Sequence, residues 1–309
     1  MPETRRGRRT SRARAALAAA APAAALLLAA APAAAQRKLN EKLALRPDGF
    51  VRIHNLAGSV KVTGWDRDTV AVTGVVYEPA NGEWVIGGSA EGVKMSAWSS
   101  NPGSAVQPTQ LDVRVPRNAQ VWIKTASADI AVSEFSGSLD VNSVTGRITV
   151  SGSPREVFAE TMGGALEVDA STRALRARTA SGDIRIRGAI REVTATTVSG
   201  SLTIEGDHFE RGTFESVDSD IHYFGNVGRT SVLDFQNHGG AIEFHLPASA
   251  SAEFAITTYA GGFDDQFGVR ANVLAGKLKG QEVNFALGNG GGQVTVLSFK
   301  GRVTLRRKG

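Results

Sequence analysis

The feature that most constrains the fold of this chain is a repeat of 18 residues. The segment Thr179–Ile186 reads TASGDIRI, and Thr197–Ile204 repeats its pattern as TVSGSLTI. Each copy follows a short alternating run, Leu175–Arg178 in the first case and Val193–Thr196 in the second. Alternation of apolar and polar residues predicts strands with one buried face, and the glycine between two runs predicts a bend. One unit is therefore a strand, a corner, a second strand and a second corner.

The repeat runs through most of the chain. Positions two and four residues after the glycine, and five and seven residues before it, are apolar in nearly every unit. Such columns are typical of a solenoid, in which each unit buries its apolar face against its neighbours. We therefore predict an all-β single-stranded β-helix, or β-solenoid, with about ten coils of ~18 residues and two short strands per coil. The glycine position is filled by Gly58, Ala128, Gly146, Gly164, Gly182, Gly200, Ser219, Gly240, Gly261 and Gly292.

A polar column accompanies the apolar ones. The residue three positions before the glycine is a Ser, Thr or Asn in all ten units: Asn55, Thr125, Ser143, Thr161, Thr179, Thr197, Ser216, Asn237, Thr258 and Asn289. Such side chains bond turn backbone, or one another between rungs about 4.8 Å apart. We predict a polar ladder along one corner. The alternative is a row of nucleophilic hydroxyls, but no base recurs in register beside them.

The N-terminal segment has the pattern of a secretory signal peptide. Six arginines lie between Arg5 and Arg14, an apolar run follows over Ala15–Ala30, and three alanines precede Gln36. We predict a signal peptide over residues 1–35 and an extracytoplasmic mature protein: periplasmic, on the cell surface or secreted. The alternative is an uncleaved anchor, although an Ala-rich segment with two prolines makes a weak spanning helix. We expect no transmembrane span after cleavage.

Charge and cysteine content narrow the function classes. The chain has 35 basic and 30 acidic residues, and the predicted leader holds six arginines and Glu3, so the mature chain has 29 of each. Without a net positive charge, nucleic acid is not an expected partner. The chain has no cysteine. Disulfides therefore do not stabilise it, and a lipid anchor through an N-terminal cysteine is excluded.

We expect residues 36–309 to form a single β-solenoid domain. A strand-rich insertion or cap is predicted over 64–116, where the repeat is interrupted, and regular coils with C-terminal strands over 117–309. Within the insertion we expect a strand over Thr69–Tyr77 and a hairpin over Gly82–Ser96. The insertion carries three of the four tryptophans, Trp65, Trp84 and Trp98. It is expected to fold over the first coils or to cap the open end of the solenoid.

Two outward columns contain candidate functional residues. Six positions before the glycine, Trp122, Asp140, Phe158 and Arg176 occupy successive coils, with Arg178 beside them. Outward aromatic residues mark a glycan or protein contact, so Trp122, Phe158, Arg176 and Arg178 are candidate binding residues. The alternative is that the tryptophan-bearing insertion covers them.

The second candidate lies three positions after the glycine, where His222, Glu243 and Asp264 follow one another on successive coils. Three such side chains could approach one cation or form an acid/base cluster. The alternative is an exposed row of solvated polar residues, and the spacing is not a known ligand motif. No metal or cofactor is therefore assigned, and the calcium-binding nonapeptide GGxGxD is absent from the sequence.

Several segments also point to a family. The sequences LDVRVPRNAQVWIKTASADIAV, SGDIRIRG, SGSLTIEG, LPASASAEFAITTYAGGF and GNGGGQVTVLSFKGRVTLRR resemble the bacterial putative-adhesin domain family, a β-strand-repeat domain of unknown function. The resemblance covers the chain from Phe50 to its C-terminus. It implies a single-stranded β-helix of the envelope or cell surface, and the family offers no defined catalytic residues to transfer.

The sequence thus predicts a secreted or envelope-associated, non-enzymatic β-solenoid with an adhesin, interaction or structural role. Its expected partner is a cell-surface glycan or an envelope protein. The alternative is a β-helical polysaccharide-active enzyme that uses the His222/Glu243/Asp264 cluster. A polymerising scaffold is a third class, which the secretory leader disfavours.

Overall fold

The computed structural model describes residues 35–78, 82–99, 107–206, 209–270, 272–275 and 280–308. All of the predicted signal peptide except Ala35 lies outside these residues, as does the side chain of Trp98. Over the described ranges the secondary structure consists of β-strands and turns, and no segment forms a helix that could cross a membrane. Residues Ala34–Gly309 form one compact unit.

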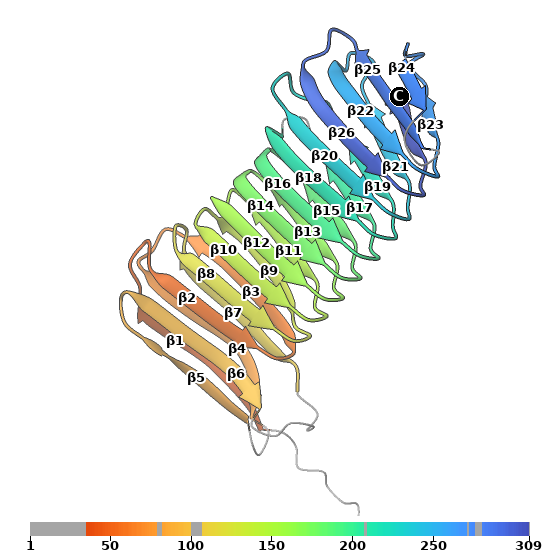
Figure 1. The fold of residues 1–309 in the computed structure, drawn as a ribbon. Helices are drawn as coiled ribbons and strands as arrows, with labels where there is room; N and C mark the ends of the chain where they lie inside the picture. Colours follow the sequence, from red (N-terminus) through yellow and green to blue (C-terminus); the bar gives the residue numbers. More distant parts are fainter. Residues whose placement is uncertain are drawn as a thin grey trace, which may run out of the picture. The chain divides into compact units, whose positions relative to one another are not determined.

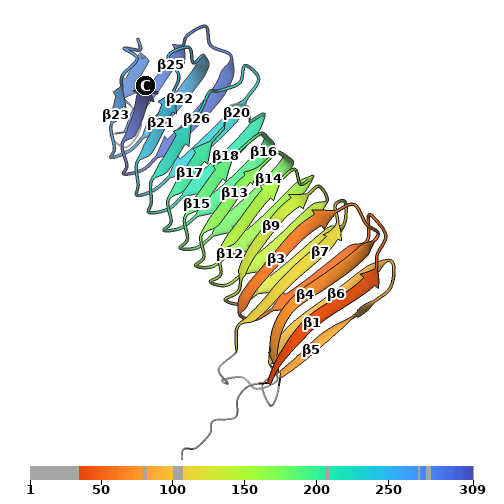
Figure 2. The ribbon, with the colours of Figure 1, turned by 180° about the vertical axis from the view of Figure 1, so that it is seen from behind.

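The described strands form two sheets, which face each other across a shared apolar core (Figure 1, Figure 2). In spatial order, the 13-stranded sheet A contains β1 (Ala35–Ala44), β4 (Thr69–Glu78), β7 (Thr109–Pro116), β3 (Gly58–Trp65), β9 (Asp129–Phe135), β11 (Ile148–Gly152), β13 (Leu166–Ala170), β15 (Ile184–Arg187), β17 (Leu202–Glu205), β19 (Ile221–Phe224), β21 (Ile242–Leu246), β27 (Val303–Arg307) and β23 (Phe263–Asp265). In the opposite direction, starting from the C-terminal end of the stack, the 14-stranded sheet B contains β24 (Asn272–Ala275), β25 (Gln281–Leu287), β22 (Ala252–Thr258), β26 (Gly292–Ser298), β20 (Val232–Asn237), β18 (Arg211–Ser216), β16 (Ile190–Thr197), β14 (Thr172–Thr179), β12 (Glu156–Thr161), β10 (Ser138–Ser143), β8 (Gln120–Thr125), β2 (Phe50–Asn55), β6 (Gly92–Ser99) and β5 (Gly82–Gly88).

The 18-residue spacing appears in the structure as parallel strand pairing. Strand β13 pairs with β15 so that Leu166 lies beside Ile184, and β12 pairs with β14 in the same way. Side chains alternate between the core and the solvent along each strand: Ile184 and Ile186 are 1% and 0% exposed, whereas Arg185 points outward and is exposed. The all-β prediction and the inward assignment are confirmed here, and the two parallel-rich sheets are consistent with a β-solenoid.

The corners explain why glycine recurs. A Cβ atom added to Gly164 would lie 2.0 Å from the carbonyl oxygen of Gly146, and one added to Gly182 would lie 1.8 Å from that of Gly164. Successive corners therefore stack too closely for a side chain.

The predicted polar ladder is confirmed at these corners. The backbone N–H of Gly164 donates to Thr161 Oγ1 at 3.1 Å, and Thr161 Oγ1 donates to the carbonyl oxygen of Val144 in the preceding rung at 3.3 Å. Thr161 itself is 2% exposed. The hydroxyl thus satisfies the buried N–H of Gly164, which an apolar residue would leave without this acceptor, and it adds a hydrogen bond to the preceding rung.

The described residues of the N-terminal insertion extend both sheets. The predicted strand and hairpin form as β4 and as the antiparallel pair β5–β6, and β6 continues sheet B beside β2. The edge of β2 supplies backbone partners to the hairpin, so the insertion caps the end of the stack. Trp84 of β5 is 7% exposed, and its Nε1 donates to Glu41 Oε1 of β1 at 3.4 Å, which links the two sheets there. No described residue of the insertion lines the groove that contains Trp122 and Phe158, so the part of the insertion that the structure describes does not cover them.

The order of the C-terminal strands also differs from the prediction. Strand β26 lies between β20 and β22, and β27 lies between β21 and β23. The last two strands of the chain are therefore inserted into the stack ahead of β22 and β23, which come earlier in the sequence. The corner glycine of this pair is Gly301 instead of Gly292: a Cβ atom at Gly301 would lie 1.7 Å from the Gly240 carbonyl oxygen. Ser298, which is 0% exposed, takes the ladder position predicted for Asn289. Strand β25 pairs antiparallel with β22.

Candidate functional site

A shallow groove crosses the outer face of sheet B. We call it the aromatic groove; its volume is about 490 Å³. Strand pairing brings Asp140 between Trp122 and Phe158, and it places Arg176 beside Phe158. Both rings are half-buried. The groove is lined by Phe50, Gln120, Val121, Trp122, Ser138, Leu139, Asp140, Glu156, Val157, Phe158, Ala174, Leu175, Arg176, Glu192 and Thr194.

The indole of Trp122 is fixed by its neighbours at one end of the groove. The His54 ring meets it edge to face at a centroid distance of 4.8 Å. The Arg52 guanidinium lies 5.2 Å from the Trp122 ring centroid and 5.1 Å from that of Phe50. Burial, followed by the positive charges of Lys94, Arg52 and Lys124, lowers the pKa of His54. At this end of the groove the Trp122 ring therefore packs against a neutral imidazole and a cation, neither of which lines the groove.

Asp140 supplies the polar group between the two rings. Its Oδ1 accepts a hydrogen bond from Asn142 Nδ2 at 2.6 Å. Burial raises the pKa of Asp140, the Asn142 hydrogen bond lowers it and the Glu160 charge raises it, with a net upward shift. The groove thus combines two aromatic faces with an oriented hydrogen-bond acceptor.

The structure brings together three of the four binding residues predicted from sequence. Arg178 lies on the same strand face as Arg176, two residues later on β14, and beyond the lining of the groove. Sequence reasoning missed Phe50 and Glu192, which also line it. Both lie eight residues before a corner glycine. Side chains at this position point outward, next to those six residues before the glycine, where Trp122, Phe158 and Arg176 lie. The alternation of side chains between the two faces of a strand is enough to predict that these two residues share the outer face with Trp122 and Phe158.

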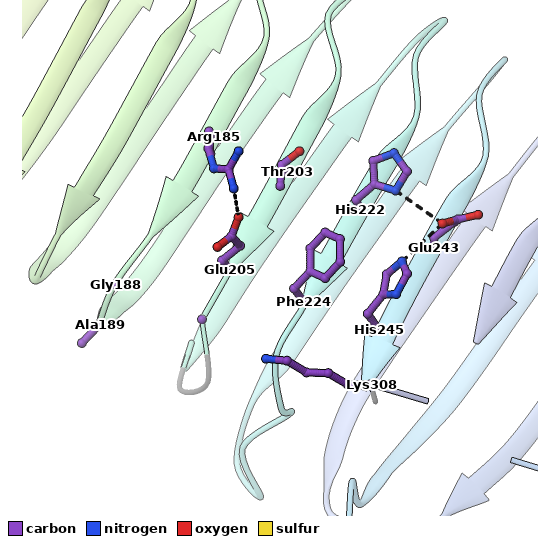
Figure 3. A pocket seen from close by; sticks show the side chains of 11 residues that line it. Arg185, Gly188, Ala189, Thr203, Glu205, His222, Phe224, Glu243, His245 and Lys308 are labelled. Atoms are coloured by element: carbon purple, nitrogen blue, oxygen red, sulfur yellow. Dashed lines mark hydrogen bonds and ion pairs between the residues drawn. The ribbon is translucent and has the colours of Figure 1, made fainter. Parts of the chain in front are cut away.

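A cluster of titratable side chains lies on the outer face of sheet A; we call it the His–Glu cluster (Figure 3). It consists of His222 from β19 with Glu243 and His245 from β21, two strands that pair in parallel. Glu243 Oε2 lies 3.3 Å from His245 Nε2 and 3.6 Å from His222 Nδ1. Glu243 Oε1 accepts a hydrogen bond of 3.0 Å from the Arg306 guanidinium of β27. The carboxylate is therefore held from both sides.

The charge state of Glu243 follows from these contacts. Burial opposes its ionisation, but the hydrogen bond and the charge of Arg306, the hydrogen bond of His245 and the charge of His222 outweigh burial and lower the pKa of Glu243. The side chain is 23% exposed. Glu243 is thus an ionised carboxylate at neutral pH.

An open hollow of about 980 Å³ surrounds the cluster. Phe224 stacks on the His245 ring at a centroid distance of 4.3 Å and an interplanar angle of 15°. Glu205, paired with Arg185 and Arg187, lines the same hollow, as does the exposed Lys308 (Figure 3). The imidazoles therefore face solvent and remain accessible to a ligand.

Asp264 does not join His222 and Glu243. It lies on β23, and strand β27 stands between β23 and β21, so Thr304 is the register neighbour of Glu243 on that side. The Asp264 carboxylate pairs with Arg302 instead. The third member is His245, which sequence reasoning missed because it lies five residues after the corner glycine instead of three. Because His245 lies two residues after Glu243 on the same strand, alternation predicts that both side chains point outward, and this could have indicated His245 as a member.

The fold defines the class of protein: two facing, largely parallel sheets built from short repeated strands. Residues 113–264 match the family described as Toastrack DUF4097. This segment is thereby identified as a domain of a putative-adhesin family whose function is unknown. No curated protein matches the sequence.

Three solved structures are similar over most of the chain. A putative adhesin from Bacteroides fragilis is 11% identical, with a TM-score of 0.44, and the match covers 89% of this chain and 98% of that one. A putative adhesin from Parabacteroides merdae is 11% identical, with a TM-score of 0.42 and coverage of 87% and 96%. A putative cell adhesion protein from Clostridium sporogenes is 8% identical, with a TM-score of 0.24 and coverage of 88% and 100%.

Proposed function

We propose that the protein is a non-enzymatic β-solenoid of about ten coils that binds a cell-surface glycan in the aromatic groove. After removal of residues 1–35 it acts outside the cytoplasm, in the envelope or as a secreted protein. The observation that carries the proposal is the placement of Trp122 and Phe158 on either side of Asp140, on the outer face of sheet B. A glycan is favoured over an envelope protein, which is the competing partner.

The chemistry of the groove suits a sugar. The apolar C–H face of a pyranose packs on an aromatic ring, and its hydroxyl groups donate to carboxylates and accept from guanidinium groups. The groove offers Trp122 and Phe158 for the first contact, and Asp140 and Arg176 for the second. Because the lining carries Asp140, Glu156 and Glu192 against Arg176, it is net acidic, and a neutral, hydroxyl-rich ligand fits better than a polyanionic polymer.

The enzyme alternative that uses the His222/Glu243/Asp264 cluster finds little support in the described residues. A glycosidase needs two carboxyl groups flanking one bond, one of them with a raised pKa so that it can act as the general acid. Glu243 is bound to Arg306 and Asp264 to Arg302, strand β27 separates the strands of the two carboxyl groups, and the pKa of Glu243 is lowered. The repeated hydroxyl groups of the polar ladder are buried in the corners, where no substrate reaches them.

A glycan-binding screen on the purified protein tests the proposal. We expect the wild type to bind at least one bacterial surface oligosaccharide, and Trp122→Ala or Phe158→Ala to weaken binding at least tenfold because a stacking face is lost. The matched control is Phe299→Ala. It removes another exposed aromatic residue, 43% exposed, which does not line the groove. Binding restricted to envelope proteins, or equal binding by all variants, would contradict the glycan assignment.

A further inference from the structure

The His–Glu cluster has the composition and spacing of a metal site. One atom from each of His222, Glu243 and His245 can be chosen so that all three lie within 4.8 Å of one another. Two imidazole nitrogens and one carboxylate oxygen are a donor set that suits zinc. The shared atom is Glu243 Oε2, which lies between the two rings.

The distances match the edges of a coordination tetrahedron. A zinc ion with ligands at about 2.0–2.1 Å places neighbouring donor atoms about 3.3 Å apart. The distances from Glu243 Oε2 to His245 Nε2 and His222 Nδ1 are 3.3 Å and 3.6 Å. All three side chains are partly exposed, at 30%, 23% and 22% for His222, Glu243 and His245. The third pair of donor atoms, on His222 and His245, lies within 4.8 Å, so metal binding would have to bring the His222 ring closer to His245.

The surroundings orient the donors. Arg306 binds Glu243 Oε1 at 3.0 Å, so that Oε2 is the oxygen left facing the imidazoles. Phe224 stacks on His245 and restricts rotation of its ring. Outer contacts of this kind fix ligand geometry in metal sites. Parallel pairing of β19 with β21 sets the positions of all three backbones.

We infer that His222, Glu243 and His245 bind one Zn²⁺ ion on the outer face of sheet A. The fourth coordination position faces the surrounding hollow and is open to water or to a donor atom of a bound partner. This site is separate from the aromatic groove, which lies on the other sheet, so it stands or falls independently of glycan binding.

The test is metal binding by the purified protein without a histidine tag. Dialysis against Zn²⁺ followed by elemental analysis should give one ion per chain, and Zn²⁺ should raise the thermal unfolding midpoint because it binds the folded state. Mg²⁺ should do neither, since it prefers an octahedron of oxygen ligands. Co²⁺ should produce the visible absorption bands of a tetrahedral site.

Single variants separate this site from nonspecific binding. We expect His222→Ala and His245→Ala each to weaken Zn²⁺ binding at least tenfold and to abolish the Co²⁺ bands. The control is His238→Ala, which removes an exposed histidine that stacks on Phe299 outside the cluster. Absence of saturable Zn²⁺ binding by the wild type would overturn the inference. So would binding that survives in His245→Ala, or that is lost equally in His238→Ala.

Discussion

At the scale of single residues, two adjacent glycines of one corner have different surroundings. A Cβ atom on Gly164 would lie 2.0 Å from the carbonyl oxygen of Gly146, whereas one on Gly163 would have its nearest neighbour at 3.6 Å. Gly164→Ala must push two rungs apart, and we expect it to lower the free energy of unfolding by about 1–3 kcal/mol. Urea denaturation measures this change.

Gly163→Ala is the matched control, since it adds the same methyl group one residue away. It should leave stability unchanged or raise it slightly, because alanine restricts the unfolded chain. Equal destabilisation by both substitutions would mean that the corners do not stack as described.

Two carboxyl groups should affect stability with opposite signs. Burial, opposed by the Asn142 hydrogen bond and reinforced by Glu160, raises the pKa of Asp140. For Glu205, burial is outweighed by the hydrogen bonds and charges of Arg187 and Arg185, and the pKa is lowered. Ionised Asp140 therefore costs stability, which is regained as the pH falls through its raised pKa; ionised Glu205 contributes stability, which is lost as the pH falls through its lowered pKa.

Thermal unfolding of two variants across pH checks these signs. At pH 7, Asp140→Asn should unfold at a higher temperature than the wild type, and Glu205→Gln at a lower one. Both differences should shrink toward zero in acid, where the wild-type carboxyl groups are protonated. Shifts in the same direction at neutral pH would contradict the assigned environments.

At the scale of strands, the inserted position of β26 can be tested by cross-linking. Gln236 of β20 lies beside Leu297 of β26, and Leu297 lies beside Thr257 of β22. If the strands stacked in chain order, Gln236 would instead neighbour Thr257. Because the chain has no cysteine, engineered pairs report without interference.

We expect the pair Gln236→Cys/Leu297→Cys to form a disulfide on mild oxidation, since adjacent strands bring their Cα atoms within the range a disulfide requires. The pair Gln236→Cys/Thr257→Cys should stay reduced, because β26 stands between the two strands. Mass spectrometry after alkylation of free thiols distinguishes the two. Cross-linking of the second pair would mean that β20 lies directly beside β22, and it would contradict the inserted position of β26.

The strand order shows where sequence reasoning stops. Val294 and Val296 point inward whether the corner glycine is taken as Gly292 or as Gly301, so the period of two fits both alignments. The choice depends on which strands β26 contacts, and those contacts are distant in sequence. Inward and outward faces were predictable because they depend on local alternation; the place of β26 was not.

The candidate sites also divide into residues whose grouping depends on the local repeat and residues whose grouping depends on the strand order. Trp122, Phe158 and Arg176 could be grouped from sequence because coils of equal length place equivalent positions side by side. His222 and Glu243 were paired for the same reason, although their coils are longer. Asp264 was misplaced because β27 enters between its strand and that of Glu243. The wrong prediction for Asp264 therefore comes from the strand order, which was not predicted, and not from the pattern of inward and outward residues.

At the scale of the whole molecule, the first strand begins at the predicted processing site. Strand β1 runs over Ala35–Ala44 and pairs antiparallel with β4, so the residues directly after the predicted leader belong to sheet A. We expect mass spectrometry of exported protein to give an N-terminus near Gln36. Exported protein that retains its first 35 residues would instead indicate a membrane anchor.

The central claim is that the aromatic groove binds a cell-surface glycan without converting it. Isothermal titration calorimetry with the oligosaccharide that binds best in the screen tests both parts, because binding gives heat that saturates and turnover gives heat that persists. We expect saturation near one ligand per chain, no persistent heat, and no signal from the Trp122→Ala/Phe158→Ala variant. Persistent heat from the wild type, or an unchanged isotherm in the double variant, would contradict the claim.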